Sequence, residues 1–586
     1  MTIHAFISRS AGVLLAAAML VLAGCKPEAS GPPRTDVIVV GAGMAGLAAA
    51  IEAAAGGARV TVLDSNSVGG GHAILASGFS LVGTPLQERM GYRDDVETAV
   101  ADILAWGEDA DPWWVRRYVE ASRPEVHDWL VARGVQFAMI LPNPEDSVPR
   151  FHLPRGAAAG AVLPVLREAL ANERISFIWN HEVSGLLHDA SGVSGIRARD
   201  LRGGGELELH AAAVILASGG FESNDRLVRE HWPAARAVPD PLYVGAGHFA
   251  TGGGLQLASD AGAALVRMDR QLVYVTGMPD PRDAAGRRGL LVLNPAAIMV
   301  DGSGRRFIDE AGASKDIEAL VLSRSPATYW LVFDEPARAQ LMIRGGPWLD
   351  AGTIEREIMA DPALVSRGGD IRALALAAGL PADGLAATVA RYNRFVREGE
   401  DADFRRFGGA TAGRLPPLLD TPPFYAIQLF PMTRKSMGGV AIDHQTRVLD
   451  AAGQPIRGLY AAGEVTGIAG INGSHGGSGT FLGPSLLQGR MAGQAAAAML
   501  APGRGVVTPL ATALRTPATV PPDDPALLDG RLAADEPGFW HFRQVHRMVV
   551  QRELACGDCH RAAWPPGPAR TREQQLLQFE ACTRCH

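Results

Sequence analysis

The chain has 586 residues, of which 47% are hydrophobic and 20% are charged, and it contains 69 glycines and 39 prolines. At roughly 150 residues per domain, this length predicts about three or four domains' worth of mass and a sizeable core. The composition is that of a globular, loop-rich protein, which excludes a disordered chain and a fibre. A formal net charge of −7 without any Lys/Arg run argues against a nucleic-acid partner.

Residues 1–24 are predicted to be an export signal. Arg9 precedes an apolar run at 11–23, and small residues lead up to Cys25. The run is too short to span a bilayer comfortably. The segment resembles a bacterial lipoprotein signal, which implies cleavage before Cys25 and a lipid on that cysteine; a plain secretory signal or a short membrane anchor is the alternative. Each interpretation places the body outside the cytoplasm, in the periplasm, with residues 25–35 as a tether.

A nucleotide-binding unit is predicted next. Residues 36–40 form a short apolar strand, and a glycine turn with Gly41, Gly43 and Gly46 leads from it into an Ala-rich helix. A second strand ends in Asp64, which lies 21 residues after Gly43 (64 − 43), where a carboxylate can bond a ribose hydroxyl. We expect a pyrophosphate at the helix N-terminus. A strand–helix–strand unit without nucleotide is the alternative.

Five motifs in the body resemble, in their order along the chain, the fumarate reductase/succinate dehydrogenase flavoprotein superfamily. They are GAGMAGLAAA after DVIVV, SVGGGHAILASGF at 67–79, AVILASGGFESN at 213–224, GHFATGGGLQLASDAGA at 247–263 and GLYAAGEVTG at 458–467. The resemblance implies FAD and an α/β fold, α+β overall. It further implies a Rossmann-like FAD-binding domain in two parts, 36–268 and 432–501, with an inserted capping domain at 269–431.

The same resemblance implies a set of FAD-binding residues. Glu464 is expected to bond the FAD ribityl or ribose hydroxyls, and the turn at Gly219 and Gly220 is expected to pass close to the cofactor. The complete expected set is Gly41, Gly43, Gly46, Asp64, Gly71, His72, Gly78, Ala217, Gly219, Gly220, Glu464, Ser485 and Leu486.

His72 stands where membrane-bound succinate dehydrogenases of the superfamily carry a covalent flavin, in a His-x-x-x-Ala-x-Gly context. Soluble fumarate-reducing relatives tend to have Asn there and hold FAD without a bond. Two expectations therefore stay open: covalent attachment at His72, and a histidine hydrogen-bonded to the flavin edge.

The substrate side departs from the superfamily pattern. The position of the Arg that delivers the proton in fumarate reductases is occupied by Ser314, with Lys315 beside it. The carboxylate-binding His is replaced by Lys435, and the second carboxylate clamp by a stretch containing His475. A bidentate Arg is the physical means of holding a carboxylate, so these departures argue against a C4 dicarboxylate substrate. The stretch HGGSGTFLGPSLLQGR at 475–490 instead resembles the end of 3-ketosteroid dehydrogenases.

Lysine is nearly absent from the chain. It occurs only as Lys26, Lys315 and Lys435, against 55 Lys and Arg in total. Unlike Arg, a desolvated Lys can lose its proton, so the two internal lysines are candidates for catalysis. We expect Lys315 as proton donor or acceptor, Lys435 with Arg434 as an anion or carbonyl anchor, and His475 as a second acid/base. The alternative is that they are solvated loop residues.

The C-terminal region is predicted to carry haem. All four cysteines after Cys25 belong to two CxxCH motifs, which are the attachment signature of c-type haem, whereas a disulfide pair or a zinc site needs no following His. The motifs are Cys556-Gly-Asp-Cys559-His560 and Cys582-Thr-Arg-Cys585-His586, with His560 and His586 as proximal iron ligands. His541 and His546 are candidates for the sixth ligands, with Met548 as an alternative, or are surface residues of an amphipathic helix. A linker at 502–537 would join this small, mostly helical dihaem cytochrome c module, residues 538–586, to the body.

FAD together with two c-type haems implies an extracytoplasmic flavocytochrome c oxidoreductase. We expect it to reduce or form a carbon–carbon double bond next to a carbonyl or carboxylate, with an unsaturated acid, an enone or the reduced form as substrate. The haems would exchange electrons with a periplasmic or membrane redox partner, either quinol-linked or a cytochrome, and the lipid alone would contact the membrane. The alternatives are a ketosteroid-like or cyclic-ketone dehydrogenase with the haems as electron outlet, and an electron-transfer protein without substrate turnover.

Overall fold

The computed structural model describes residues 34–190, 192–202, 204–345, 351–407, 415–500 and 506–507. The predicted export signal, the dihaem module and nearly all of the linker lie outside these residues. The same holds for Cys25, Cys556, Cys559, Cys582, Cys585, His541, His546, His560 and His586.

The nucleotide-binding domain is built on a six-stranded sheet whose strands come from both predicted parts of that domain. Its spatial order is β22-β23-β11-β2-β3-β7, and every pairing is parallel except that of β22 with β23. The strands are β2 (Val37–Val40), β3 (Val60–Asp64), β7 (Ile175–Trp179), β11 (Ala213–Leu216), β22 (Arg447–Leu449) and β23 (Pro455–Ala461). The predicted strand, helix and second strand at the start of the body are confirmed. Because β23 lies directly beside β11, the chain on either side of the cap completes one sheet.

Two helices, α2 (Met44–Ala55) and α15 (Leu482–Ala498), pack closely beside this sheet. A Cβ on Gly489 would lie 2.1 Å from the carbonyl oxygen of Ala45, so only a glycine allows this approach. Alanines fill most of α2 and are buried around the helix, which is typical of a helix packed on more than one side. Since α2 begins at the carboxyl end of β2, its N-terminus faces the edge of the sheet where ligands bind in open α/β folds.

Smaller elements complete the domain. One antiparallel sheet has the order β10-β9-β8, a second has the order β4-β6-β5, and β13 pairs with β21. Terminal strands β1 (Arg34–Thr35) and β24 (Val506–Val507) pair antiparallel. The strand bounds are β4 (Phe79–Ser80), β5 (Phe137–Leu141), β6 (Phe151–Pro154), β8 (His181–Asp189), β9 (Gly192–Asp200), β10 (Glu206–His210), β13 (Leu265–Val266) and β21 (Gly439–Val440). The helices are α3 (Pro85–Arg89), α4 (Val96–Gly107), α5 (Pro112–Ala121), α6 (Asp128–Val131), α7 (Ala159–Ala171), α8 (Asp225–Glu230) and α9 (Gly253–Asp260).

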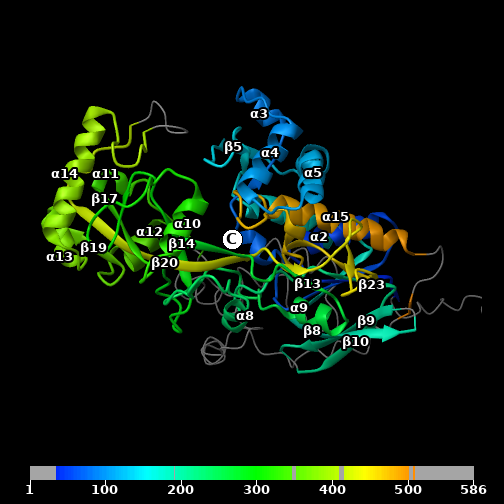
Figure 1. Cartoon of the computed structure of the whole chain (residues 1–586). Helices are drawn as coiled ribbons and strands as arrows, with labels where there is room; N and C mark the ends of the chain where they lie inside the picture. The colour runs from blue at the N-terminus through cyan, green and yellow to red at the C-terminus, as the bar shows by residue number, and fades with distance from the viewer. Residues whose placement is uncertain are drawn as a thin grey trace, which may run out of the picture.

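The cap is a separate lobe around an eight-stranded sheet, with a main order of β16-β17-β20-β14-β15-β18 and with β12 and β19 also paired to β20. The strands are β12 (Tyr243–Val244), β14 (Gln271–Pro279), β15 (Gly289–Leu293), β16 (Ile298–Val300), β17 (Tyr329–Asp334), β18 (Met342–Arg344), β19 (Val365–Gly368) and β20 (Phe424–Ser436). The helices are α10 (Ser314–Leu322), α11 (Glu335–Arg338), α12 (Ala351–Ile354), α13 (Ile371–Ala377) and α14 (Ala382–Glu398). Figure 1 shows β20 running from the outer lobe with α13 and α14 into the body of the molecule. The predicted boundary between residues 431 and 432 therefore falls inside a continuous strand.

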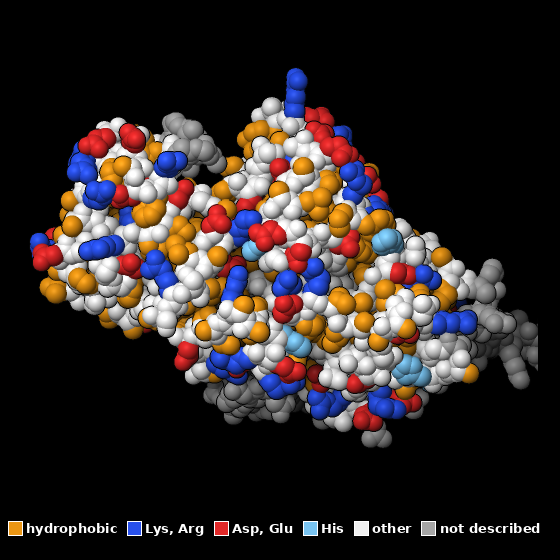
Figure 2. All heavy atoms as spheres, viewed as in Figure 1, with side chains coloured by type: hydrophobic (Ala, Val, Ile, Leu, Met, Phe, Trp, Pro, Cys, Tyr) orange, Lys and Arg blue, Asp and Glu red, His pale blue; other side chains and the backbone are white. Residues whose placement is uncertain are grey.

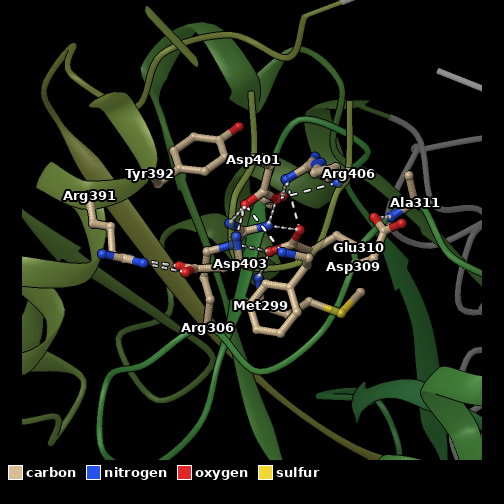
Figure 3. Close-up of polar contacts among 12 residues, drawn as sticks. Met299, Arg306, Asp309, Glu310, Ala311, Arg391, Tyr392, Asp401, Asp403 and Arg406 are labelled. Carbon is tan, nitrogen blue, oxygen red and sulfur yellow. Dashed lines mark hydrogen bonds and ion pairs between the residues drawn. The ribbon is translucent and has the colours of Figure 1, made fainter. Parts of the chain in front are cut away.

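A buried ion cluster fastens the cap internally. Arg306 donates to Asp401 at 3.0 Å and to Glu310 at 2.7 Å, and Arg406 donates to Glu310 at 3.2 Å. Figure 3 shows these four side chains converging from separate segments of the cap. Each charge has an opposite partner, which is the condition under which buried ions are tolerated. The cluster holds the loop after β16, which leads into α10.

The face seen in Figure 2 carries no large field of one sign. On the face seen in Figure 2, Lys/Arg and Asp/Glu side chains are interspersed over both lobes. Within the described residues, no helix is both long enough and apolar enough to cross a membrane. The same residues contain no cluster of three or more His, Cys, Asp or Glu side chains placed to hold a metal ion.

Candidate active site

The glycine turn at the end of β2 forms a cradle for a phosphate group. Gly43 caps α2 without a side-chain bond, and the first turn of α2 has no acidic residue, so the helix presents free N–H groups and its positive end. A Cβ on Gly43 would meet nothing within 4 Å, and Gly43 lines a cavity. At Gly41, where φ is 107°, a Cβ would lie 2.5 Å from the carbonyl oxygen of Ala217, so a glycine is required. The turn fits the pyrophosphate of FAD.

Asp64 lies beside this turn, at the end of β3. Its Oδ2 accepts the N–H of Ala42 at 2.7 Å and its Oδ1 accepts the N–H of Asn66 at 2.7 Å. Burial raises the pKa of the Asp64 carboxyl to about 6, although both hydrogen bonds act in the opposite direction. Each oxygen retains further acceptor capacity, which suits the role predicted for this residue toward a ribose hydroxyl.

A cavity of about 470 Å³ extends from the glycine turn to the cap. Both domains contribute apolar and polar side chains to its wall, and the charged ones from the cap include Glu310, Lys315, Glu318 and Arg344. Of the expected FAD-binding residues, those lining the cavity are Gly43, His72, Gly78, Ala217, Gly219, Glu464 and Ser485. The apolar wall from the cap includes Leu272, Val273, Val275, Leu291, Leu293, Met299 and Ile317. All four predicted catalytic residues, Lys315, Arg434, Lys435 and His475, also line the cavity.

Lys435, near the end of β20, is buried between two cavity-lining groups. Its Nζ lies 3.1 Å from Nδ1 of His72 and 3.2 Å from Oε2 of Glu464. Burial lowers the pKa of Lys435 despite the opposing effect of Glu464, in agreement with the desolvation expected from the sequence. Burial, reinforced by the charge of Lys435, lowers the pKa of His72 far below its ordinary value. His72 is therefore a neutral imidazole, and its Nε2 is buried without a hydrogen-bond partner.

Glu464 is oriented by the strand that carries Lys435. Its Oε1 accepts the backbone N–H of Ser436 at 3.1 Å. A Cβ on Gly220 would lie 1.9 Å from Oγ of Ser436 and 2.7 Å from Oε1 of Glu464, so a glycine leaves the space for this contact. Gly220 thus makes room for Glu464, which is predicted to bind the cofactor, without lining the cavity itself.

The rim of the cavity has a three-residue charge contact. Oε1 of Glu108 lies 3.3 Å from Nζ of Lys315 on α10 and 3.3 Å from Nε2 of His475. His475 and Lys315 together lower the pKa of the Glu108 carboxyl. Glu108 follows α4 in a backbone conformation with φ 64°, which is rare for a residue with a side chain. Through this contact, the cap helix is tied to the nucleotide-binding domain.

Arg434 is held by the backbone. Its Nη1 donates to the carbonyl oxygen of Gly245 at 2.6 Å, and its Nη2 donates to that of Leu75 at 3.3 Å. The side chain is buried, and it joins β20 to the loop before α9 and to the short helix at 71–75. Arg434 therefore supplies a buried positive charge to the cavity wall while its guanidinium bonds main-chain oxygens.

The remaining predicted residues do not line the cavity. A Cβ on Gly46 would lie 1.9 Å from the carbonyl oxygen of Gly41, so Gly46 allows α2 to approach the turn. Gly71 lies against Gly43, because a Cβ on Gly71 would lie 3.4 Å from the Gly43 Cα. Leu486 is fully buried in the hydrophobic core around α2 and α15. These positions shape the site without facing it.

Four acidic residues at or beside the cavity were not predicted from the sequence, and one of them, Glu310, lines it from the loop before α10. Glu108 makes the rim contact, and Glu318 lines the cavity from α10. Glu222 is fully buried with neither carboxylate oxygen hydrogen-bonded, and burial raises its pKa well above the ordinary value. The signal available for Glu222 is an acidic side chain directly after the apolar run and glycine turn of AVILASGGFESN. Glu108 and Glu318 lie in stretches without a motif.

The comparisons with known proteins agree with this geometry. The model of the FAD binding domain family matches residues 36–482. A KsdD-like steroid dehydrogenase of Mycobacterium tuberculosis is 32% identical over 79% of this chain and 95% of its own length. A fumarate reductase (cytochrome) of Shewanella frigidimarina is 32% identical over 80% of this chain and 78% of its own length. A 3-ketosteroid-Δ4-(5α)-dehydrogenase from Rhodococcus jostii, solved with 4-androstene-3,17-dione, has a TM-score of 0.61 at 28% identity and covers 81% of this chain and 99% of its own.

The glycine cradle, the cavity under the cap and these similarities agree on one cofactor and one class of chemistry. The chain belongs to the FAD binding domain family of flavoproteins and is an FAD-dependent oxidoreductase that acts on CH–CH groups.

Proposed function

We propose that this enzyme reduces, or in reverse forms, a carbon–carbon double bond next to a carbonyl or carboxylate. The observation that carries the proposal is the cavity in which residues expected to bind FAD meet the buried Lys435 and the cap helix α10. When bound, FAD supplies hydride chemistry at its isoalloxazine ring. The protein has to orient the substrate, exclude water and handle one proton.

Lys435 is the group best placed to polarise the substrate carbonyl. Its ammonium lies at the cavity wall in a desolvated setting, where a positive charge acts on a developing negative charge more strongly than in water. Glu464 and His72 hold the ammonium in place. His475 also lines the wall and is fixed by Glu108, so it can donate a second hydrogen bond to the same oxygen. Lys315 keeps α10 over the cavity through its own contact with Glu108.

The apolar cap wall favours a substrate with one carbonyl and a hydrophobic body. Leu272, Val275 and Leu291 line the cavity. A dicarboxylate would need two polar clamps, and the two arginines of the wall, Arg344 and Arg434, already donate to Ser77 and to main-chain oxygens. This observation supports a second candidate function, a ketosteroid-like or cyclic-ketone dehydrogenase that runs the reaction toward the alkene. The similarity to steroid dehydrogenases over 95% of one relative's length supports the same candidate.

We further propose that two c-type haems at the C-terminus exchange single electrons with the flavin, and that the protein is an extracytoplasmic lipoprotein. The support for the haems is the pair of CxxCH motifs and the similarity to a fumarate reductase (cytochrome). The support for export is the N-terminal sequence up to Cys25. Expression with a c-type cytochrome maturation system should give a Soret band, and Cys556→Ala with Cys559→Ala should halve the haem content. A protein without a Soret band contradicts the haem proposal.

Stopped-flow reoxidation of the dithionite-reduced protein tests the reaction. We expect enones with a hydrophobic body to reoxidise the flavin faster than fumarate does. Haem midpoint potentials then separate the two candidates, because clearly negative values suit a reductase and high values suit a dehydrogenase. If no unsaturated acid or enone reoxidises the protein, and no saturated ketone reduces the oxidised form, an electron-transfer role without turnover replaces both candidates.

A further inference from the structure

Helix α10 carries an acidic residue on the face where a proton donor is missing. Ser314 stands at the position where the superfamily pattern has the proton-donating Arg. Glu318 follows Ser314 by four residues on the same helix. Residues four apart lie one above the other on a helix. Ser314 and Glu318 both line the cavity, so the face of α10 that they share is the one turned to it.

The surroundings of Glu318 are those of an acid that keeps its proton. The side chain is 15% exposed, and its charged partner is Arg236, whose Nη1 lies 3.6 Å away. Strand β14, which packs against α10, brings Tyr274, Val275 and Thr276 to the cavity wall and adds no charge. Burial raises the pKa of Glu318 to about 8, and Arg236 only partly opposes this effect. The carboxyl is therefore mostly protonated at neutral pH.

The other charges on or near α10 are engaged elsewhere. Lys315 contacts Glu108 at 3.3 Å, and Asp316 is exposed in the first turn of the helix. Glu310 of the preceding loop is committed to Arg306 and Arg406. Among the carboxyl groups named here, Glu318 alone combines a place at the cavity wall with a raised pKa.

We propose that Glu318 is the acid–base residue of the reaction, an assignment that rests on the proposed function. In the reductive direction, the substrate gains a hydride at one alkene carbon and the Glu318 proton at the carbon next to the carbonyl, so the C=C π bond is replaced by two C–H bonds. Bound reduced FAD would supply the hydride, and with it the two electrons, and Glu318 is left as a carboxylate. Arg236, 41% exposed, places the carboxylate within reach of solvent, from which a proton returns. In the oxidative direction, the carboxylate removes that proton.

The test compares Glu318→Gln and Glu318→Asp with Asp316→Asn, a matched change of an exposed acid on the same helix. Infrared difference spectra of the purified flavoprotein should show a protonated-carboxyl band that titrates near pH 8 in wild type minus Glu318→Gln and no such band in wild type minus Asp316→Asn, so that the carboxyl of Glu222 cancels. The rate of alkene reduction in the wild type should fall as pH rises through this value. Glu318→Gln should lower that rate by about 10²- to 10⁴-fold with flavin content unchanged, as expected for loss of a general acid.

Glu318→Asp should retain part of the rate with a displaced pH profile, which a merely structural residue would not do. A Glu318→Gln enzyme within about threefold of the wild type at every pH, or a wild-type minus Glu318→Gln infrared difference spectrum that shows no lost protonated-carboxyl band, overturns the assignment and leaves the proposed function standing. If the wild type converts no compound of the panel in either direction, the proposed function fails, and the assignment fails with it.

Discussion

Nζ of Lys435 lies 3.1 Å from Nδ1 of His72, although 363 residues separate them in the sequence. The contact joins the end of the cap strand β20 to the short helix that follows the nucleotide-binding unit. The ammonium also pairs with Glu464 at 3.2 Å, so the lysine is held between a neutral imidazole and a carboxylate. This arrangement allows a cation to remain at the wall of a largely apolar cavity.

Replacing Lys435 by Gln should lower both kcat and kcat/KM by about 100-fold or more, because the charge that stabilises the developing oxyanion is removed. Lys435→Arg keeps the charge and should recover part of the loss. Lys315→Gln is the matched control at the cavity rim and should have a smaller effect, since its partner Glu108 is exposed. Steady-state kinetics with an enone would check this. Equal losses in Lys435→Gln and Lys315→Gln would contradict a specific role for Lys435.

His72 should hold the flavin through a hydrogen bond from its free Nε2 position rather than through a covalent bond. Acid precipitation of the wild type should therefore release yellow flavin into the supernatant. His72→Asn should weaken flavin binding by about five- to tenfold, the cost of one poorly replaced hydrogen bond. Flavin fluorescence measures both quantities. A yellow pellet in the wild type that turns colourless in His72→Asn would instead establish covalent attachment at this residue.

Glu222 should make the protein less stable at high pH. Burial raises the pKa of Glu222 in the folded state above its unfolded value, so the folded state binds the proton more tightly and stability falls as pH rises through this interval. Each pKa unit between the folded and the unfolded state corresponds to about 1.4 kcal/mol of stability. This stability is lost once the pH exceeds the pKa of the folded state. Glu222→Gln cannot ionise, so its thermal stability relative to the wild type should be higher at about pH 8 than at about pH 5. If the difference in melting temperature between Glu222→Gln and the wild type is the same at both pH values, the explanation is wrong.

The buried ion cluster of the cap should depend on Asp401. Its side chain is 0% exposed and pairs with Arg306 at 3.0 Å, so Asp401→Asn leaves an uncompensated buried charge. We expect a loss of about 3–5 kcal/mol in the stability of the cap. Asp403→Asn is the control, because its partner Arg391 is 51% exposed and such pairs contribute little. Denaturant unfolding, monitored by limited proteolysis of the cap, measures the difference in stability. Equal stability of the two variants would contradict this account.

Much of the nucleotide-binding unit could be predicted because its signals are local. The apolar run at 36–40, the glycine turn and the Ala-rich stretch correspond to β2, the cradle at Gly43 and α2. Short strands, glycine turns and helix starts are encoded by neighbouring residues. The scarcity of lysine likewise directed attention to Lys315 and Lys435, both of which line the cavity.

The tertiary structure alone decided which side chains meet and which lose contact with water. The expected boundary at residue 431 lies within β20, because a strand that pairs in the cap continues unbroken to Ser436 beside Glu464. Glu108 and Glu318 have no motif around them, and only packing places one at the rim and the other against the cavity. Burial and the approach of distant segments are properties of the folded chain. They determine the charge and the proton affinity of each side chain and the groups that it can contact. The sequence by itself therefore determined the cofactor class and the local frame, whereas the fold decided the acid–base groups.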